Sequence, residues 1–255
     1  MNKYSIKMMA IVASSTVFAS CGYVGGDNDS FETPTTAAGV SANPGTISQR
    51  NFSILADDPN PPVFDTVENT ATDTTVVITV KIGDKNNQLL TDAHTVFFAT
   101  EWGLIEPSCV TVNGTCSVTW QTSFALPEDV PADLLTTITA YTLGEEDYND
   151  SNGNGEFDDG DTTPFPDGSG DLFRDREEPF VDVNFSDGGF NAASGDKIID
   201  VMDGNDLGSN AAHDFGDGFL NSPNCTQSSL CSTVRSTIYI WDDIQLDMEV
   251  PPPAP

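Results

Sequence analysis

Short segments in which apolar and polar residues alternate restrict this chain to β structure more strongly than any other part of its sequence. Between Thr75 and Ile82 the even-numbered residues are apolar, and mostly polar residues stand between them. A period of two places one face of a strand in a core and the other toward solvent. No segment carries a sustained helical period, so we predict an all-β fold.

Further strands are predicted between polar, Gly-containing and Pro-containing turns. They cover residues 94–100, 109–112, 115–120 and 134–143. Asn113-Gly114 has the composition of a two-residue hairpin turn, so the strands on either side of it are expected to pair with each other. Several short strands separated by turns are typical of a β-sandwich, which we place at residues 48–143.

A last alternating segment lies far beyond these strands. Its apolar residues all have even numbers and are interrupted only by Asp242; they are Ile238, Ile240, Ile244, Leu246 and Met248. We therefore predict that residues 234–248 form the last strand of the sandwich, and that residues 144–233 are a long, acidic, loop-rich insertion before it. A separate C-terminal domain over 144–248 is the alternative. Residues 249–255 are a Pro-rich tail.

The order of these segments resembles the bacterial Ig-like domains of the invasin/intimin type. The resemblance runs from about residue 50 to residue 143 and rests on four stretches in order: Val76 to Gly83, Val96 to Ala99, Ser117 to Trp120 and Ile138 to Tyr141. It implies an Ig-like β-sandwich. The two cysteines near Trp120, an Ala-Tyr strand and the acidic run after Gly144 are also similar to a group of uncharacterised bacterial surface lipoproteins, which implies a cell-surface setting and no particular activity.

The N-terminus has the three parts of a secretory signal. Two lysines precede an apolar run from Met8 to Ala19, and small residues follow it. This pattern predicts a signal peptide over residues 1–20. Phe18-Ala19-Ser20-Cys21 resembles the lipobox of bacterial lipoproteins, although Phe18 stands where Leu is usual; the resemblance implies that Cys21 becomes lipidated. An ordinary signal peptide with a chance cysteine is the alternative.

The expected lipid places the protein at a membrane. Several acyl chains on Cys21 are a stable anchor, because each buried CH₂ contributes about 0.8 kcal/mol. Gly22 resembles the outer-membrane sorting pattern, so we expect an exported protein held in the outer membrane through its N-terminal lipid. Residues 21–47, rich in Gly, Ser, Thr, Asn and Pro, are expected to be a flexible tether.

Four cysteines remain, in two close pairs: Cys109 with Cys116, and Cys225 with Cys231. Three connectivities are possible, and an oxidising compartment favours the two local disulfides. Zinc is disfavoured because neither pair has a two-residue spacing, and because the two histidines, His94 and His213, are far apart in the sequence.

The charge balance excludes a nucleic-acid binder that works through a basic face. The chain has 9 basic and 40 acidic residues, for a formal net charge of −31, and phosphate neutralisation requires Lys and Arg. Residues 144–219 contain 21 of these acids and only three bases, Arg174, Arg176 and Lys197. Excess carboxylates in a folded segment face water or hold cations.

Residues 150–161 match the twelve-residue calcium loop. Oxygen-bearing side chains stand at the ligand positions, Glu156 offers its backbone carbonyl, Gly155 permits the turn, and Phe157 is the apolar residue that anchors the loop. The predicted ligands are Asp150, Asn152, Asn154, Glu156, Asp158 and Asp161. Position 12 is Asp161 where Glu is usual, and prolines follow, so we expect a helix-free structural Ca²⁺ site. A solvated turn is the alternative.

A second, weaker loop follows with one extra residue before its glycine. Its predicted ligands are Asp182, Asn184, Asp187, Asn191 and Asp196. Phe190 repeats the place of Phe157 relative to the glycine, which suggests a degenerate repeat; a second calcium ion stays open. The acids and amides around residues 200–217 have no loop spacing and are expected to be solvated, with His213 beside them as a further candidate ligand.

No catalytic constellation stands out in the sequence. There is no nucleophile elbow or phosphate-binding glycine loop, and nothing selects a pair among the many carboxylates. The expected function is therefore non-catalytic: a calcium-stabilised outer-membrane lipoprotein in adhesion or cell-surface architecture, with a protein or glycan partner at the surface. An accessory subunit of an envelope assembly, such as a pilus, filament or secretion machinery, is the alternative, and a glycoside hydrolase is a minor one.

Overall fold

The computed structural model describes residues 45–65, 70–71, 73–122, 130–185, 189–201 and 210–249. The predicted signal peptide, Cys21, most of the predicted tether and the end of the Pro-rich tail lie outside the described residues. Within the described part the chain is all-β, and its helical structure is the short 3-10 turn η1 (Gln49–Asn51). The same part contains no helix long and apolar enough to cross a membrane.

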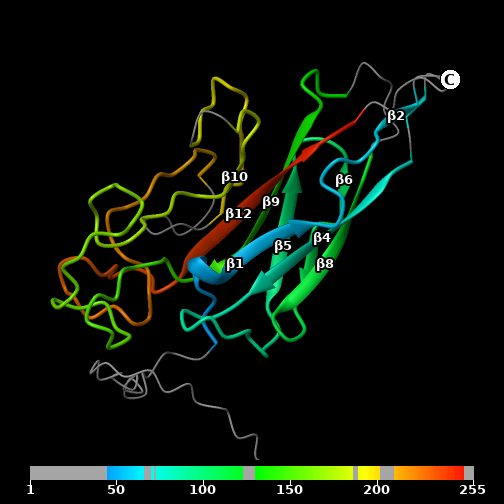
Figure 1. Cartoon of the computed structure of the whole chain (residues 1–255). Coiled ribbons are helices and arrows are strands. Elements are labelled where there is room, and N and C mark those ends of the chain that lie inside the picture. Colours follow the sequence, from blue (N-terminus) through cyan, green and yellow to red (C-terminus); the bar gives the residue numbers. More distant parts are fainter. Residues whose placement is uncertain are drawn as a thin grey trace, which may run out of the picture. The chain divides into compact units, whose positions relative to one another are not determined.

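Eight strands form two four-stranded antiparallel sheets (Figure 1). The first sheet has the order β1 (Phe52–Ala56), β4 (Thr75–Ile82), β8 (Thr115–Gln121), β6 (Leu104–Ile105). The second has the order β12 (Ile238–Asp247), β9 (Leu135–Gly144), β5 (Thr95–Thr100), β7 (Ser108–Val110). Two minor ladders pair β2 (Phe64–Asp65) with β3 (Thr70–Ala71), and β10 (Phe180–Val181) with β11 (Lys197–Ile198). The predicted all-β sandwich is confirmed.

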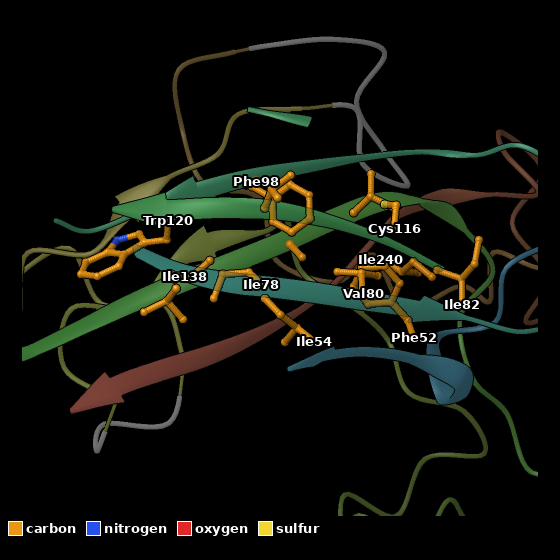
Figure 2. Close-up of a cluster of buried hydrophobic side chains, with 14 of the residues drawn as sticks. Phe52, Ile54, Ile78, Val80, Ile82, Phe98, Cys116, Trp120, Ile138 and Ile240 are labelled. Atoms are coloured by element: carbon orange, nitrogen blue, oxygen red, sulfur yellow. The ribbon is translucent and has the colours of Figure 1, made fainter. Parts of the chain in front are cut away.

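Side chains from both sheets form one core. Figure 2 shows Ile78 and Val80 of β4 between the ribbons, close to Ile138 and Ile240 of the second sheet. These four side chains are fully buried, which accounts for the alternation seen in the sequence. Trp120 lies at one end of this core and donates from its indole Nε1 to the carbonyl of Trp102 at 2.9 Å.

The predicted hairpin around Asn113-Gly114 is wrong beyond its turn. Both turn residues have positive φ, 52° and 73°, and Val112 pairs with Thr115. The two arms then separate, because β7 joins the second sheet and β8 the first. A turn motif fixes only the local reversal, whereas burial in the sandwich decides which sheet each arm joins. The predicted local disulfide Cys109–Cys116 is present, and it links β7 of the second sheet to β8 of the first.

Strand β12 pairs with β9 over its whole length. The register runs from Ile238 opposite Gly144 to Asp247 opposite Leu135. Its outer edge is capped at Trp241 by the side chain of Gln49, whose Nε2 donates to the Trp241 carbonyl at 3.0 Å and whose Oε1 accepts the Trp241 N–H at 3.3 Å. An amide side chain thus takes the place of a neighbouring strand at this point.

Residues 145–237 connect β9 to β12 and also cover them. In Figure 1 these loops, from green through yellow to orange, lie beside β9 and β12. Thr139 on the outer face of β9 is fully buried and donates to the carbonyl of Phe180 at 2.7 Å. The guanidinium of Arg176 lies 4.2 Å from the ring centre of Trp241, and Phe180 packs edge-on against the same ring. The middle of both strands is therefore covered on both faces, an arrangement that alternation alone does not predict.

Candidate metal centre

The predicted calcium loop is anchored by a small aromatic core of its own. Phe157 is fully buried, and its ring packs edge-on against Tyr148 and Phe173 at centroid distances of 5.5 and 6.0 Å. Leu220 completes this buried cluster, which is separate from the core of the sandwich. The apolar residue of the loop motif thus occupies the buried position that the sequence predicts for it.

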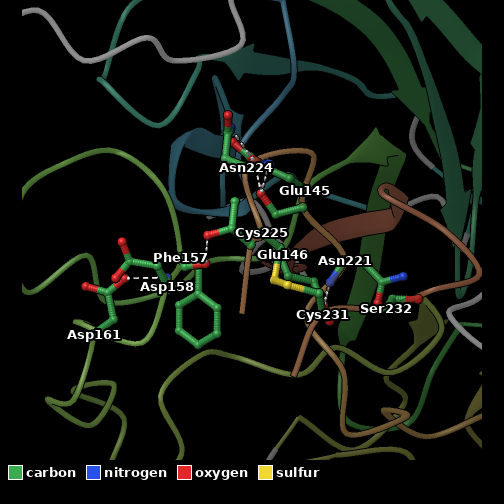
Figure 3. The surroundings of a disulfide bond; sticks show 12 residues. Glu145, Glu146, Phe157, Asp158, Asp161, Asn221, Asn224, Cys225, Cys231 and Ser232 are labelled. Atoms are coloured by element: carbon green, nitrogen blue, oxygen red, sulfur yellow. Dashed lines mark hydrogen bonds between the residues drawn. A yellow bond between two sulfur atoms is a disulfide. The ribbon is translucent and has the colours of Figure 1, made fainter. Parts of the chain in front are cut away.

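Backbone hydrogen bonds join this loop to the second disulfide. The N–H of Phe157 donates to the carbonyl of Asn224 at 2.9 Å, and the carbonyl of Phe157 accepts the N–H of Thr226 at 2.9 Å. Figure 3 shows Phe157 beside the Cys225–Cys231 disulfide, with Asp158 and Asp161 on the other side of its backbone. The disulfide therefore closes the segment on which the loop is held.

The carboxylates at the two ends of the motif hold the loop backbone in shape. Asp150 accepts the N–H groups of Gly153 and Gly155, both at 2.7 Å. Asp161, which is 1% exposed, accepts the N–H groups of Ser151 at 2.8 Å and Asp158 at 3.0 Å. These bonds cross the loop, so both ends and the central turn lie within reach of the same two carboxylates.

The side chains at the third, fifth and ninth positions converge. Asn152 and Asn154 donate from their Nδ2 atoms to the two carboxylate oxygens of Asp158, at 2.9 and 2.6 Å. The N–H of Gly160 and these amides lower the pKa of Asp158 below its usual value, so its carboxyl is ionised. An amide group carries an oxygen as well as a nitrogen, and rotation about its terminal bond exchanges the two. The same three side chains are thus able to present oxygens to one cation.

Peptide geometry directs the carbonyl of Glu156. In a planar trans peptide the C=O and the following N–H point in opposite directions, and the described chain contains no cis peptide bond. Because the N–H of Phe157 points to Asn224, the C=O of Glu156 points away from Asn224. The backbone oxygen that the motif requires is therefore not directed at the disulfide-closed segment that contains Asn224.

These groups fit a hard cation. Three carboxylates, two amides and one carbonyl supply only oxygen ligands, as Ca²⁺ prefers, whereas zinc favours Cys and His. Each carboxylate oxygen has two lone pairs, so an oxygen that accepts one N–H is still able to bind a cation. Within the described ranges, no three His, Cys, Asp or Glu side chains form a ready-made metal group. In this loop the carboxylates of Asp150 and Asp161 face backbone N–H groups.

The second predicted loop is brought together only in part. Asp196 accepts the N–H of Val183 at 2.9 Å and that of Asn191 at 2.8 Å, so it ties two parts of the loop together. Asn184 is exposed, and Asp187 lies outside the described residues. Asp182 is buried near Asp243 of β12, where the two carboxylates repel each other. Asp182 therefore faces the sandwich, away from the pattern that a single-ion loop requires.

The described acids around residues 200–217, and His213 beside them, form hydrogen bonds and ring contacts within the protein. Asp200 accepts the N–H groups of Asn210 and Ala211 at 3.0 and 2.5 Å; Asp203, Asn205 and Asp206 lie outside the described residues. The ring of His213 stacks on Phe190 at 4.0 Å, and its Nε2 lies 3.0 Å from a carboxylate oxygen of Glu177. His213 is thus part of an aromatic cluster over β10.

Two acids directly after β9, which no sequence motif marks, connect the insertion to the sandwich. Glu145 accepts the hydroxyl of Ser222 at 2.6 Å. Glu146 accepts the N–H groups of Arg176 at 2.6 Å and Asn221 at 2.7 Å. Both carboxyls are almost fully buried, and burial raises the pKa of Glu146 to about 8. Their only sequence signal is a pair of acids directly after a strand.

Comparison with known proteins gives no further assignment. No protein-family model matches the chain, no curated protein matches it, and no solved structure matches it.

Proposed function

We propose that this protein is an exported, lipid-anchored protein of the outer membrane, with an Ig-like sandwich and a calcium-stabilised insertion, that acts without catalysis in adhesion or cell-surface architecture. The observation that carries the proposal is the loop at 150–161, where side chains spaced for calcium converge on Asp158 and the backbone is fixed to a disulfide-closed segment. The two antiparallel sheets support the Ig-like assignment.

Calcium would act on the stability of the insertion. Carboxylates held close together repel one another when no cation is present. Extracellular calcium modules bind with Kd values on the order of 10⁻⁴ to 10⁻³ M. An ion at a hundred times its Kd stabilises the folded form by about 2.7 kcal/mol, so millimolar calcium is expected to keep the insertion folded.

Calorimetric titration with calcium, together with limited proteolysis in calcium and in EDTA, tests this proposal. We expect heat of binding for the wild type, and cleavage within 144–219 only in EDTA. Asp150→Asn is expected to weaken binding, whereas Asp159→Asn, an equal charge change at an exposed position of the loop that supplies no ligand, leaves it unchanged. Absence of binding heat, or equal resistance of the insertion in both buffers, contradicts the calcium site.

The acids of the insertion support a structural role over catalysis. Glu146 and Asp161 are buried and accept backbone N–H groups, so they organise loops. Screening the soluble domain against glycosides and other hydrolysable substrates tests this conclusion. Turnover that is lost on mutation of a single acid would establish the minor alternative, a glycoside-type hydrolase.

Lipid attachment and partners need separate experiments. Metabolic labelling with a radioactive fatty acid is expected to mark the wild type and leave Cys21→Ala unlabelled; equal labelling contradicts the anchor. Mass spectrometry of material that co-purifies with the lipidated protein in calcium distinguishes the two functional classes. Surface glycans or surface proteins favour adhesion, and a stoichiometric subunit of a pilus, filament or secretion machine favours the accessory role.

A further inference from the structure

Lys85 reaches from the sandwich to the calcium loop. It lies in the turn after β4, and its Nζ donates to the hydroxyl of Tyr148 at 2.6 Å. That hydroxyl in turn donates to the carbonyl of Gly155 at 3.0 Å, at the central turn of the loop. A continuous chain of hydrogen bonds thus connects a cationic side chain of the sandwich to the loop backbone.

The Tyr148 hydroxyl holds one side of the peptide between Gly155 and Glu156. Without a cation the other side is also held, because the N–H of Glu156 donates to Oδ1 of Asn154 at 2.8 Å; the Tyr148 bond remains when the Asn154 amide rotates to turn its oxygen to a cation. The next peptide is fixed in turn by the bond from the Phe157 N–H to Asn224. Glu156 therefore lies between two oriented peptides, which sets the direction of its own carbonyl oxygen.

The charge of Lys85 acts on the same loop. Four carboxylates are close enough to interact electrostatically with its ammonium group: Glu145, Asp150, Glu156 and Asp84. Lys85 is only partly exposed, so water screens these interactions less than on an open surface. Arg50 lines the same small cavity, and its guanidinium pairs with Asp147 at 2.8 Å. Arg50 is thus engaged by Asp147, whereas the hydrogen bond of Lys85 leads to the loop.

We propose that Tyr148 and Lys85 set the calcium affinity of the loop in opposite directions. Tyr148 is a positioning residue that fixes the peptide before Glu156; together with the Asn224 bond to the following peptide, it keeps the Glu156 carbonyl in place and so strengthens binding. Lys85 is a cation beside the loop that attracts its carboxylates in the absence of calcium and opposes the approach of a second positive charge. This inference rests on the calcium site proposed above and adds how the sandwich controls it.

Calorimetric titration of the full chain with calcium alone tests the proposal. Lys85→Met keeps the length of the side chain and removes its charge, so we expect the Kd to fall by about three- to fivefold, a difference that disappears as ionic strength rises. Tyr148→Phe keeps the buried ring and removes the hydroxyl, so we expect the Kd to rise by about fivefold. Lys85→Arg is expected to retain the wild-type Kd.

The control is Lys81→Met, an equal loss of charge on an exposed residue of β4. The role of Lys85 is overturned if the Kd of Lys85→Met equals that of Lys81→Met, or if it is higher than that of the wild type. An unchanged Kd for Tyr148→Phe overturns the positioning role. If the wild type itself gives no binding heat, both this inference and the calcium site fail, whereas normal wild-type binding with unaltered variants overturns this inference alone.

Discussion

Replacement of Phe157 by alanine is expected to unfold the insertion without unfolding the sandwich. The Phe157 ring is fully buried in a cluster of four side chains that is separate from the main core. Its backbone bonds to Asn224 and Thr226 do not involve the ring and remain possible in the variant. The substitution therefore tests the packing of the aromatic cluster and leaves the hydrogen-bonding groups in place.

The magnitude follows from the contacts that are lost. Burial of a phenylalanine side chain contributes about 1.5–3 kcal/mol, and each of the edge-on contacts with Tyr148 and Phe173 adds about 0.5–1.5 kcal/mol. A cavity remains as well, so we expect the free energy of local unfolding to fall by about 3–5 kcal/mol. Because about 1.4 kcal/mol corresponds to a factor of ten, exchange of protected amides in the insertion should accelerate at least about a hundredfold.

Hydrogen exchange resolved by residue or by peptide measures this effect. The reporters in the insertion are the amides of Thr226 and Ser232, which are bonded to carbonyls of Phe157 and Leu220; the reporters in the sandwich are the amides of β4 and β8. Phe219→Ala, at a position that is 43% exposed, is the matched control. Equal acceleration for both variants, or equal acceleration in the sandwich and the insertion, would refute the existence of a separately stabilised unit.

Three further predictions concern the strands and the second disulfide. Burial and two neighbouring carboxylates raise the pKa of Asp243 from 3.8 to about 6, so the contribution of the protonated carboxyl to stability is lost as pH rises through about 6. After allowance for solvent screening, we expect Asp243→Asn to stabilise the protein by about 1–2 kcal/mol at pH 8 and not at pH 3.5. Urea unfolding at the two pH values measures this difference. Replacement of Cys225 and Cys231 by serine should cost about 2 kcal/mol and lower the Tm, because a short closed loop is released; an unchanged Tm contradicts this. Gln49→Ala should cost about 1–3 kcal/mol in the same urea assay, because the backbone of Trp241 loses its amide partner.

The sequence predicts the long strands because burial of one face imposes a period of two. This holds for β4 and for β12, whose even-numbered Ile240 and Leu246 are buried in the core. It does not hold for the assignment of strands to sheets. The residues around Asn113-Gly114 encode a reversal of direction, but the choice of sheet for each arm depends on contacts with β4 and β5, which no local pattern records.

The candidate site is likewise predictable only in part. Its cation ligands are predictable because a cation loop uses alternate residues of one short segment, and Asp150 and Asp158 lie in the segment that the spacing selects. The residues that hold the loop are distant in the sequence: Asn224 and its partner Phe157 are more than sixty positions apart, and so are Lys85 and its partner Tyr148. Each is an ordinary polar residue in its own sequence context. Only the folded chain brings them to the loop.

The pairing of β12 with β9 has a consequence for the order of folding. Strand β9 is complete at Gly144, but the strand that covers its free edge begins at Ile238, after the whole insertion. Pairing over so long a separation carries a loop-closure cost and is slow. As the chain emerges during synthesis, an unpaired edge of the second sheet therefore stays open until nearly the entire folded region is available. In this interval the chain is most exposed to aggregation and most in need of a chaperone.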